Sequence, residues 1–186
     1  MVTTTDTTQI ITQPKIRAQN QPSLKHWLKH FFFLPAAKRY FSKTDMTAIA
    51  QAVTQAEHGH VGEIQVVIEG HIPCLQAYQQ TPRRRAEQLF AELGVWDTAH
   101  NSGILLYLNL CEQQVELVVD RGICTETHTL AWEAICRTMV QQLKHGDYRA
   151  AVVDAVLAIG EVLDQFYMQH DDQDQNELGN EPIILG

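Results

Sequence analysis

The chain has 186 residues, of which 45% are hydrophobic, which suits one folded domain with a full core. Its formal net charge of −8 is uneven: residues 1–43 carry seven Lys/Arg and one acid, residues 44–169 carry seven Lys/Arg and sixteen Asp/Glu, and residues 170–186 carry five acids and no base. Because the central part is acidic, and nucleic-acid-binding domains usually carry positive charge on a folded face, the composition argues against nucleic-acid binding.

The two ends of the chain differ in composition from the middle. Residues 1–22 are polar and show no sustained period, which predicts a flexible leader, and residues 170–186 predict an acidic disordered tail. Residues 23–43 form a basic segment rich in aromatics, within which 24–41 could contact a membrane surface peripherally. The alternative is a helix or turn packed on the domain. The uncharged run of this basic segment, 31–37, is far shorter than the roughly 20 residues that a membrane span needs.

The first half of the central part predicts two helices and two strands. Apolar residues at helical spacing predict a helix that begins near Thr44 and stops near Gly59. Alternating apolar residues in EIQVVIE (63–69) predict a strand. A threonine followed by proline opens a helix over 82–93, and the short apolar run GILLYLNL (103–110) predicts a mostly buried strand.

The second half adds a returning strand and two helices. A short polar turn precedes VELVV (115–119), which predicts a hairpin. Helical periodicity then covers 129–143 and 147–168, and the first of these helices is expected to bury Leu130.

This order of elements predicts an α/β fold, a three-layer αβα sandwich with a small mixed sheet. The βαβ unit over 63–110 requires parallel strands with a right-handed crossover, and the hairpin adds an antiparallel strand. No glycine-rich phosphate loop or dinucleotide fingerprint follows a predicted strand.

This topology gathers polar residues at one end of the sheet. The two parallel strands start there and the antiparallel strand ends there, which brings together Glu63, Asp97, Asn101 and Asp120. Carboxylate and amide oxygens are the ligands that Ca²⁺ and Mg²⁺ prefer. The sequence therefore predicts a divalent-cation site made by these four residues.

A purely structural interpretation of the same residues stays open. Asp120 and Arg121 could cap loop amides or pair with each other. Asn101 could form an Asx turn before Gly103, and Glu63 could be a solvated residue at a strand start.

Histidines offer a competing metal site. His58, His60, His100 and His128 could approach the same end, and imidazole nitrogens suit zinc. No pair has the i, i+4 spacing of a helical metal site, so exposed loop histidines are the default interpretation. Ser102 and the cysteines lack a recognisable nucleophile motif.

The remaining notable residues have ordinary structural interpretations. The run of arginines at 83–85 should lie at the opposite end of the sheet, as a solvated helix face or as a phosphate site at a helix start. Trp96 and Trp132 are expected to be core or edge aromatics. The four cysteines lack metal-type spacing and are expected to be reduced, with Cys111 and Cys124 acting as small apolar residues.

Several stretches resemble the TPM-domain family, in particular a soluble bacterial branch. The matching pieces are GEIQVVIE, RRRAEQLFAELGVWDTAHNSGILLYLNL, VELVVDRGI and HGDYRAAVVDAVLAIGEVL. The most specific feature is the Asn-x-Gly strand start followed by a hairpin that ends in Asp-Arg-Gly. The resemblance covers most of residues 40–168, so 44–169 is expected to be a TPM-like αβα domain.

The resemblance also carries functional implications. It implies an αβα sandwich, a divalent-cation site to which Asp97, Asn101 and Asp120 can be matched, and a phosphatase activity proposed for plant members. Many relatives carry a secretion signal and a trailing membrane helix, which we do not find, so a cytoplasmic location with peripheral membrane contact is expected.

Two functional hypotheses follow. The first is a module that binds a protein partner, with a Ca²⁺ or Mg²⁺ ion at the sheet edge. The second is a metal-assisted phosphatase acting on phosphate esters, in which Asp120 or Asp97 holds the metal and a bound water attacks.

Overall fold

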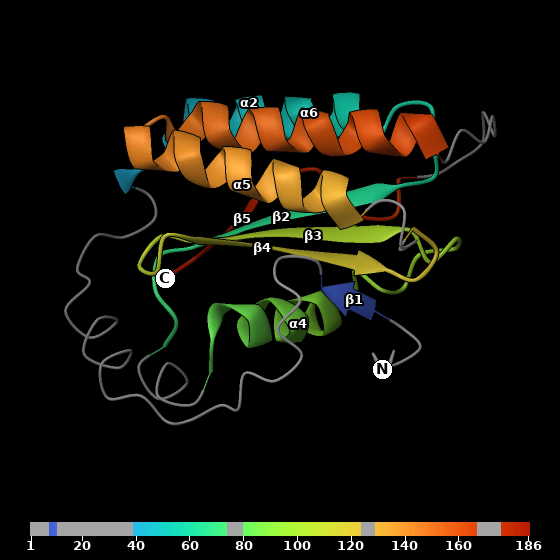
Figure 1. Cartoon of the computed structure of the whole chain (residues 1–186), viewed down its shortest axis with the longest axis horizontal. Coiled ribbons are helices and arrows are strands. Elements are labelled where there is room, and N and C mark those ends of the chain that lie inside the picture. The colour runs from blue at the N-terminus through green and yellow to red at the C-terminus, as the bar shows by residue number, and fades with distance from the viewer. Residues whose placement is uncertain (1–7, 11–38, 74–79, 124–128, 167–175) are drawn as a thin grey trace.

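The computed structural model describes residues 8–10, 39–73, 80–123, 129–166 and 176–186. Within them, four helices and five strands form a sheet with helices on both faces (Figure 1). Helices α2, α5 and α6 cover one face and α4 covers the other. The three-layer αβα sandwich is confirmed.

The bounds of the elements agree closely with the sequence pattern. The helices are α2 (Lys43–Ala56), α4 (Pro82–Glu92), α5 (Thr129–His145) and α6 (Tyr148–Phe166). The strands are β1 (Thr8–Ile10), β2 (Glu63–Glu69), β3 (Gly103–Asn109), β4 (Gln114–Asp120) and β5 (Ile183–Leu185). Each helix and strand expected in the central part of the chain is present.

The strands lie in the order β1-β4-β3-β2-β5. β2 and β3 are parallel, with Glu63 opposite Gly103, and β3 and β4 are antiparallel, with Ile104 opposite Val119. The starts of β2 and β3 and the end of β4 therefore lie at one end of the sheet, as the topology predicted.

Local sequence fixes where the helices begin. Ser42 caps α2 through a capping box: its hydroxyl oxygen accepts from the Asp45 backbone N–H at 3.2 Å, and the Asp45 carboxylate accepts from the Ser42 N–H at 2.8 Å. Thr81 caps α4 and Pro82 follows in its first turn, as expected.

The two faces of the sheet bury separate cores. Ile64, Val66 and Ile68 face the layer of α2, α5 and α6, whereas Val67 faces α4. The expectation that Leu130 is buried is wrong, because its side chain is 78% exposed. It lies five positions before the buried Ile135, which is about 140° around a helix axis at 100° per residue.

The expectation of a disordered tail and a flexible leader is wrong at two places. Residues 183–185 form β5, which pairs in parallel with residues 67–69 of β2, and Thr8–Ile10 pairs with β4. The five acids of 170–186 dominate its composition and led to the expectation of disorder, although its aliphatic run Ile-Ile-Leu is suited to a strand. An open sheet edge supplies the hydrogen-bond partners that such a run needs.

No described helix is both long and apolar enough to span a bilayer. The segment expected to contact a membrane, 24–41, lies outside the described residues except for 39–41. There Tyr40 and Phe41 pack against Tyr148, and their ring centroids lie 4.8 Å and 6.2 Å, respectively, from the centroid of the Tyr148 ring. These two aromatics therefore belong to the packing of the domain.

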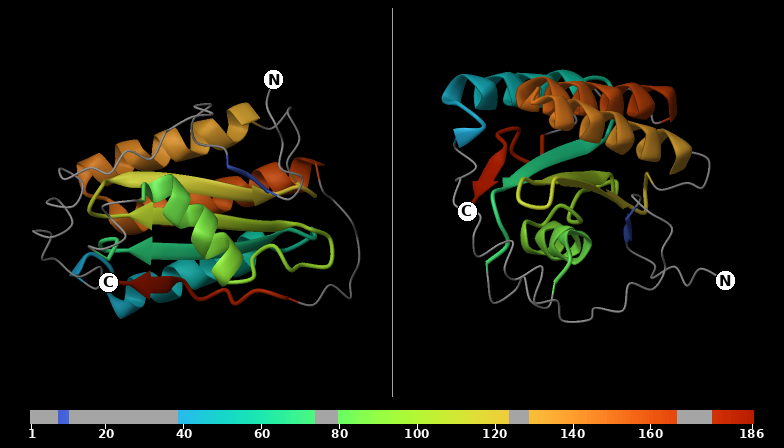
Figure 2. Two further views of the ribbon diagram at one scale, coloured as in Figure 1. Left: turned by 90° about the horizontal axis from the view of Figure 1, so that it is seen from below. Right: turned by 60° about the vertical axis from the view of Figure 1, so that its left-hand side comes forward.

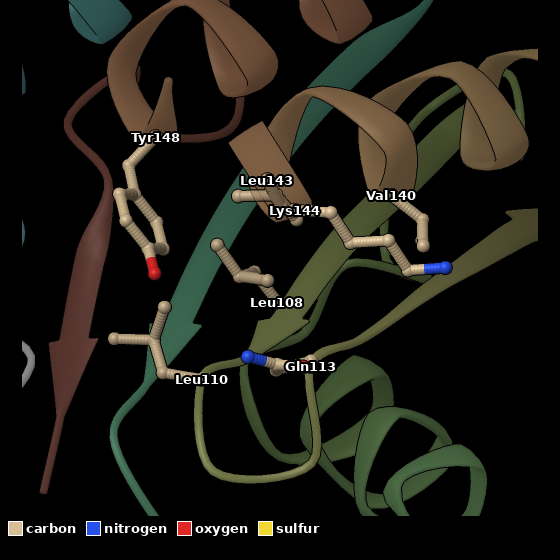
Figure 3. Close-up of a pocket in the computed structure, with 7 residues that line it drawn as sticks. All are labelled: Leu108, Leu110, Gln113, Val140, Leu143, Lys144 and Tyr148. Atoms are coloured by element: carbon tan, nitrogen blue, oxygen red, sulfur yellow. The ribbon is translucent and has the colours of Figure 1, made fainter. Parts of the chain in front are cut away.

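A small cavity lies between the β3–β4 hairpin and the α5–α6 turn (Figure 3). It is lined by Leu108, Leu110, Gln113, Val140, Leu143, Lys144 and Tyr148. Its volume of about 10 Å³ leaves room for about one water molecule, which is too little for an organic ligand.

Candidate functional site

The candidate edge is the end of the sheet formed by the loop 93–102, the turn 120–122 and the start of β2 at Glu63. Two glycines let its parts approach closely. A Cβ at Gly103 would lie 1.8 Å from the Val95 carbonyl oxygen, and a Cβ at Gly122 would lie 2.4 Å from the carbonyl oxygen of Asn101. Only glycine fits either position without a shift of the backbone.

Asn101 connects the loop to the turn. Its carbonyl oxygen accepts from the Gly122 N–H at 2.9 Å, and its side-chain oxygen accepts from an Arg121 guanidinium nitrogen at 3.2 Å. Its φ of 53° lies in the left-handed region, which asparagine tolerates better than most residues. The structure thus brings Asn101 and the Asp-Arg-Gly turn together.

Asp120 is the most unusual group at this edge. Its side chain is 2% exposed, and one oxygen, Oδ1, accepts from the Arg121 N–H at 2.6 Å. The other oxygen, Oδ2, is buried and has no hydrogen-bond partner. Burial raises the pKa of Asp120 above its usual value, against the opposing effects of the Arg121 N–H and guanidinium.

A pair of glutamates lies at the start of β2. Glu63 is 7% exposed, and its carboxylate accepts from the Leu178 N–H at 3.2 Å. Glu57 accepts from the Ile64 N–H at 2.8 Å. Burial raises the pKa of Glu57 to about 8, the Ile64 hydrogen bond opposes this, and the Glu63 charge adds to it. Glu57 could not be recognised from the sequence, because an acid between a helix and a strand is usually solvated.

Asp97 and its neighbours form the outer part of the candidate edge. Asp97 is exposed, and its backbone N–H donates to the Gly94 carbonyl at 2.9 Å. Trp96 beside it is 52% exposed, whereas Trp132 is fully buried. Across the described parts of the chain, no group of three His, Cys, Asp or Glu side chains could hold a metal ion.

The histidines expected near this edge are dispersed. His58 and His100 are exposed, and His128 lies outside the described residues. His60 is 6% exposed, and its Nδ1 accepts from the Gly62 N–H at 3.0 Å. Since Nδ1 is used as an acceptor, His60 serves the local backbone rather than offering that nitrogen to a metal.

Three nucleophilic side chains of the described chain are engaged or buried. The Ser102 hydroxyl donates to the Val61 carbonyl at 2.5 Å and is 2% exposed. Burial, followed by the charge of Glu116, raises the pKa of Cys136 to about 12, so its thiol stays protonated. Cys111 is also buried. None of these three is an activated nucleophile.

The opposite end of the sheet holds a second buried polar group, here named the polar network: Arg85, Glu69, Tyr107 and Asn109. Two guanidinium nitrogens of Arg85 donate to one Glu69 oxygen at 3.0 and 3.1 Å. The Tyr107 hydroxyl donates to the other oxygen at 2.5 Å, and the Asn109 amide donates to that hydroxyl at 2.9 Å.

This network changes how the arginine run is understood. The run lies away from the candidate edge, as the topology predicted. The solvated-face interpretation is wrong for Arg85, which is 9% exposed and ion-paired, although Arg84 is exposed. Residue type does not distinguish the three arginines, but Arg85 lies one helical turn before the buried Leu89, and this spacing places it on the inward face of α4.

Comparisons with known proteins agree with this architecture. A family model described as the TPM domain matches residues 36–162. The NMR structure of BA42 from the psychrophilic bacterium Bizionia argentinensis is similar with a TM-score of 0.67 and 21% identity, over 79% of this chain and 97% of that one. The solution structure of an N-terminal domain from P. gingivalis is similar with a TM-score of 0.60 and 20% identity, over 73% and 85% of the two chains.

No curated protein matches the chain. The two structural likenesses, at this level of identity, concern the fold alone. The family match spans more than half of the sequence and includes α2, the hairpin and most of α6. The chain belongs to the TPM-domain family.

Proposed function

We propose that this TPM domain is a protein-interaction module that binds its partner through the candidate edge. The observation that carries the proposal is Trp96, which is 52% exposed in the loop before β3. Tryptophan is enriched among the residues that dominate binding energy at protein interfaces, since one ring buries a large apolar area. The exposed charges of Asp97 and Arg121 on the same edge would supply a polar rim.

The finer part of the proposal is a divalent cation, Ca²⁺ or Mg²⁺, held at this edge with Asp120 as its buried ligand. A buried carboxylate oxygen without a partner is costly, and a hard cation would satisfy it. Asn101 and Glu63 are the neighbouring candidates, but their oxygens already accept from Arg121 and Leu178. Cation binding therefore requires at least one of these bonds to be exchanged.

The cation is tested by thermal melting with Ca²⁺, Mg²⁺ or Zn²⁺, for the wild type, Asp120→Asn and Glu161→Gln. The last is a control, because Glu161 is exposed on α6. A site saturated to 100 times its Kd adds about 2.7 kcal/mol to stability. We expect Ca²⁺ or Mg²⁺ to raise the melting temperature of the wild type and the control but not of Asp120→Asn. No response to any ion at millimolar concentration would contradict the cation.

The partner is tested by affinity capture with the wild type, Trp96→Ala and Leu130→Ala. Leu130 is the other large exposed apolar residue of the described chain and serves as the matched control. We expect proteins retained by the wild type and by Leu130→Ala to be lost with Trp96→Ala. An identical set from all three would argue against this edge. Turnover of a phosphate ester that Asp120→Asn abolishes would instead favour the phosphatase.

A further inference from the structure

The segment 176–186, here named the strap, lies along the outer edge of β2 (Figure 2). Its strand β5 pairs in parallel, with Val67 opposite Ile183 and Glu69 opposite Leu185. The Gly70 N–H extends the pairing by donating to the Leu185 carbonyl at 2.8 Å. The strap thus supplies the fifth strand of the sheet.

The strap also reaches the candidate edge. The Ala99 N–H donates to the Glu177 carboxylate at 2.9 Å, and the next residue, Leu178, donates its N–H to Glu63 at 3.2 Å. Between these contacts and β5, the Gln65 amide donates to the Glu181 carbonyl at 3.4 Å. The strap therefore contacts β2 at its start, through Glu63, at Gln65, and at its end, through the pairing with β5.

The receiving edge and the strap differ in how firmly they are held. All seven residues of β2 are buried. The three residues of β5 are only half-buried, and Glu177 and Glu181 are exposed. The strap is held by a three-residue pairing, by single hydrogen bonds and by the packing of its aliphatic side chains, whereas β2 also has a seven-residue parallel pairing with β3. The pairing of β2 with β3 is therefore longer than its pairing with the strap.

Other groups restrict where a strand can be added. The Ile64 N–H donates to the Glu57 carboxylate at 2.8 Å, and the Gln65 amide donates to the Val66 carbonyl at 3.3 Å. These side chains cover backbone groups in the first half of β2. The second half, from Val67 to Gly70, is the part that pairs with a strand.

We propose that this edge of β2 is a docking groove for an extended segment of a partner protein, and that the strap occupies the groove in cis. The inference rests on the proposed function, since it names the partner segment of the interaction module. Strand addition to a sheet edge is a common mode of peptide recognition. A bound partner would displace the strap and break its hydrogen bonds to Glu63 and Ala99 at the candidate edge.

The contacts of the strap define the chemistry of the partner segment. Ile183 and Leu185 pack toward the core on the α4 side, and Ile184 packs toward the opposite core. Glu177 lies six positions before Ile183 and accepts from the loop amide. The groove therefore selects a run of three aliphatic residues with an acidic residue about six positions earlier.

Because the strap belongs to the same chain as β2, it competes with any partner segment for the groove. A segment held on the same chain by a short connection competes at an effective concentration on the order of 1 mM. For a free segment with a Kd of about 10 μM, the ratio of 1 mM to this Kd makes binding to the intact protein about 100-fold weaker than binding to a protein whose strap can leave.

The experiment uses the full chain with a protease recognition sequence inserted between positions 167 and 175. The probe is a fluorescent peptide with the strap sequence NELGNEPIILG, and its anisotropy is measured on intact and cleaved protein. For a Kd of about 10 μM, we expect the cleaved protein to bind the peptide about 100-fold more tightly than the intact protein. A peptide with Ile183→Asp and Leu185→Asp should not bind. Cleaved protein that keeps its circular dichroism but exchanges no peptide within a day would overturn the proposal.

A second variant removes the dependence on cleavage. The intact chain carrying Ile183→Asp and Leu185→Asp should bind the peptide as the cleaved protein does. Equal affinities for the wild type and this folded variant would contradict cis occupation. A wild-type dimer that dissociates on cleavage would show that the occupant is a second copy, which also overturns the proposal. Peptide binding that persists in EDTA and in Trp96→Ala separates the groove from the candidate edge.

Discussion

The two ends of the sheet bury carboxylates in opposite ways. At the polar network, Glu69 is 1% exposed, and Arg85 and Tyr107 donate to both of its oxygens. At the candidate edge, Asp120 is 2% exposed and one of its oxygens has no partner, while the pKa of Glu57 is raised to about 8.

This difference lies in how fully the hydrogen-bonding capacity of each buried carboxylate is satisfied. A satisfied buried ion pair holds β2, β3 and α4 in register and leaves nothing for a ligand. An unsatisfied buried carboxylate is destabilising in the isolated domain, and such groups concentrate at functional sites. The satisfied network therefore stabilises the fold, and the unsatisfied carboxylate supports the proposal of a binding site at the other end of the sheet.

Breaking the polar network should have the largest effect. Arg85→Met leaves the Glu69 carboxylate buried without its cation, and we expect a loss of about 3–5 kcal/mol in the free energy of unfolding. Urea unfolding measures this loss. Arg84→Met is the matched control, because Arg84 is exposed and should change stability by no more than about 0.5 kcal/mol. Similar small losses for both variants would mean that the network is dispensable.

Crowding the candidate edge should have the next largest effect. The added Cβ of Gly122→Ala would lie 2.4 Å from the carbonyl oxygens of His100 and Asn101, so the turn must move. We expect a loss of about 2–3 kcal/mol by urea unfolding, and a changed cation response. Gly179→Ala meets no atom within 4 Å and should be close to neutral. Equal effects of the two substitutions would contradict the tight approach of loop and turn.

The pH dependence of stability should reveal Glu57. Because its pKa rises from the usual 4.5 to about 8 on folding, the folded state binds a proton more tightly than the unfolded chain. The free energy of unfolding therefore falls as pH rises through this interval. Glu57→Gln removes this slope, so its stability relative to the wild type should increase by on the order of 1–2 kcal/mol between pH 5 and pH 8.5.

Urea unfolding of Glu57→Gln and of the control Glu87→Gln at both pH values measures this difference. Glu87 is exposed on α4 and serves as the matched control for the loss of a carboxylate. Parallel pH profiles for the wild type and Glu57→Gln would show that Glu57 ionises normally in the folded protein.

Trp96→Ala should have the smallest effect on stability. Since the ring is half-exposed, we expect the free energy of unfolding to change by less than about 1 kcal/mol, whereas Trp132→Ala should cost about 3–5 kcal/mol. Thermal or urea unfolding compares the two. A large loss for Trp96→Ala would mean that this ring holds the domain together, and its effect on partner binding would then need another explanation.

How far the sequence predicts this molecule depends on the range of the interactions. The strands β2, β3 and β4 follow from local apolar patterns, and their directions follow from the connections, so the candidate edge could be located. The strand β5 could not be found, because three aliphatic residues form a strand only when an edge such as that of β2 is available.

The same limit applies to single side chains. The environment of Glu57 depends on what the fold places around it, whereas Arg85 and Leu130 follow from their positions around the helix axis. Residue type does not distinguish the inward Arg85 from the outward Arg84, and the burial of Glu57 follows from the later segments packed around α2 and β2. The sequence located the edge, but the bonding of Asn101 and Glu63 needed the structure.

The most direct test of the division between the two ends is a Ca²⁺ titration followed by backbone amide chemical shifts. We predict that saturable shifts concentrate at Glu63, in 97–103 and in 120–122, that Glu69, Tyr107 and Asn109 stay unchanged, and that Asp120→Asn abolishes the shifts. Shifts centred on the polar network, or a response that is unaltered in Asp120→Asn, would contradict the account.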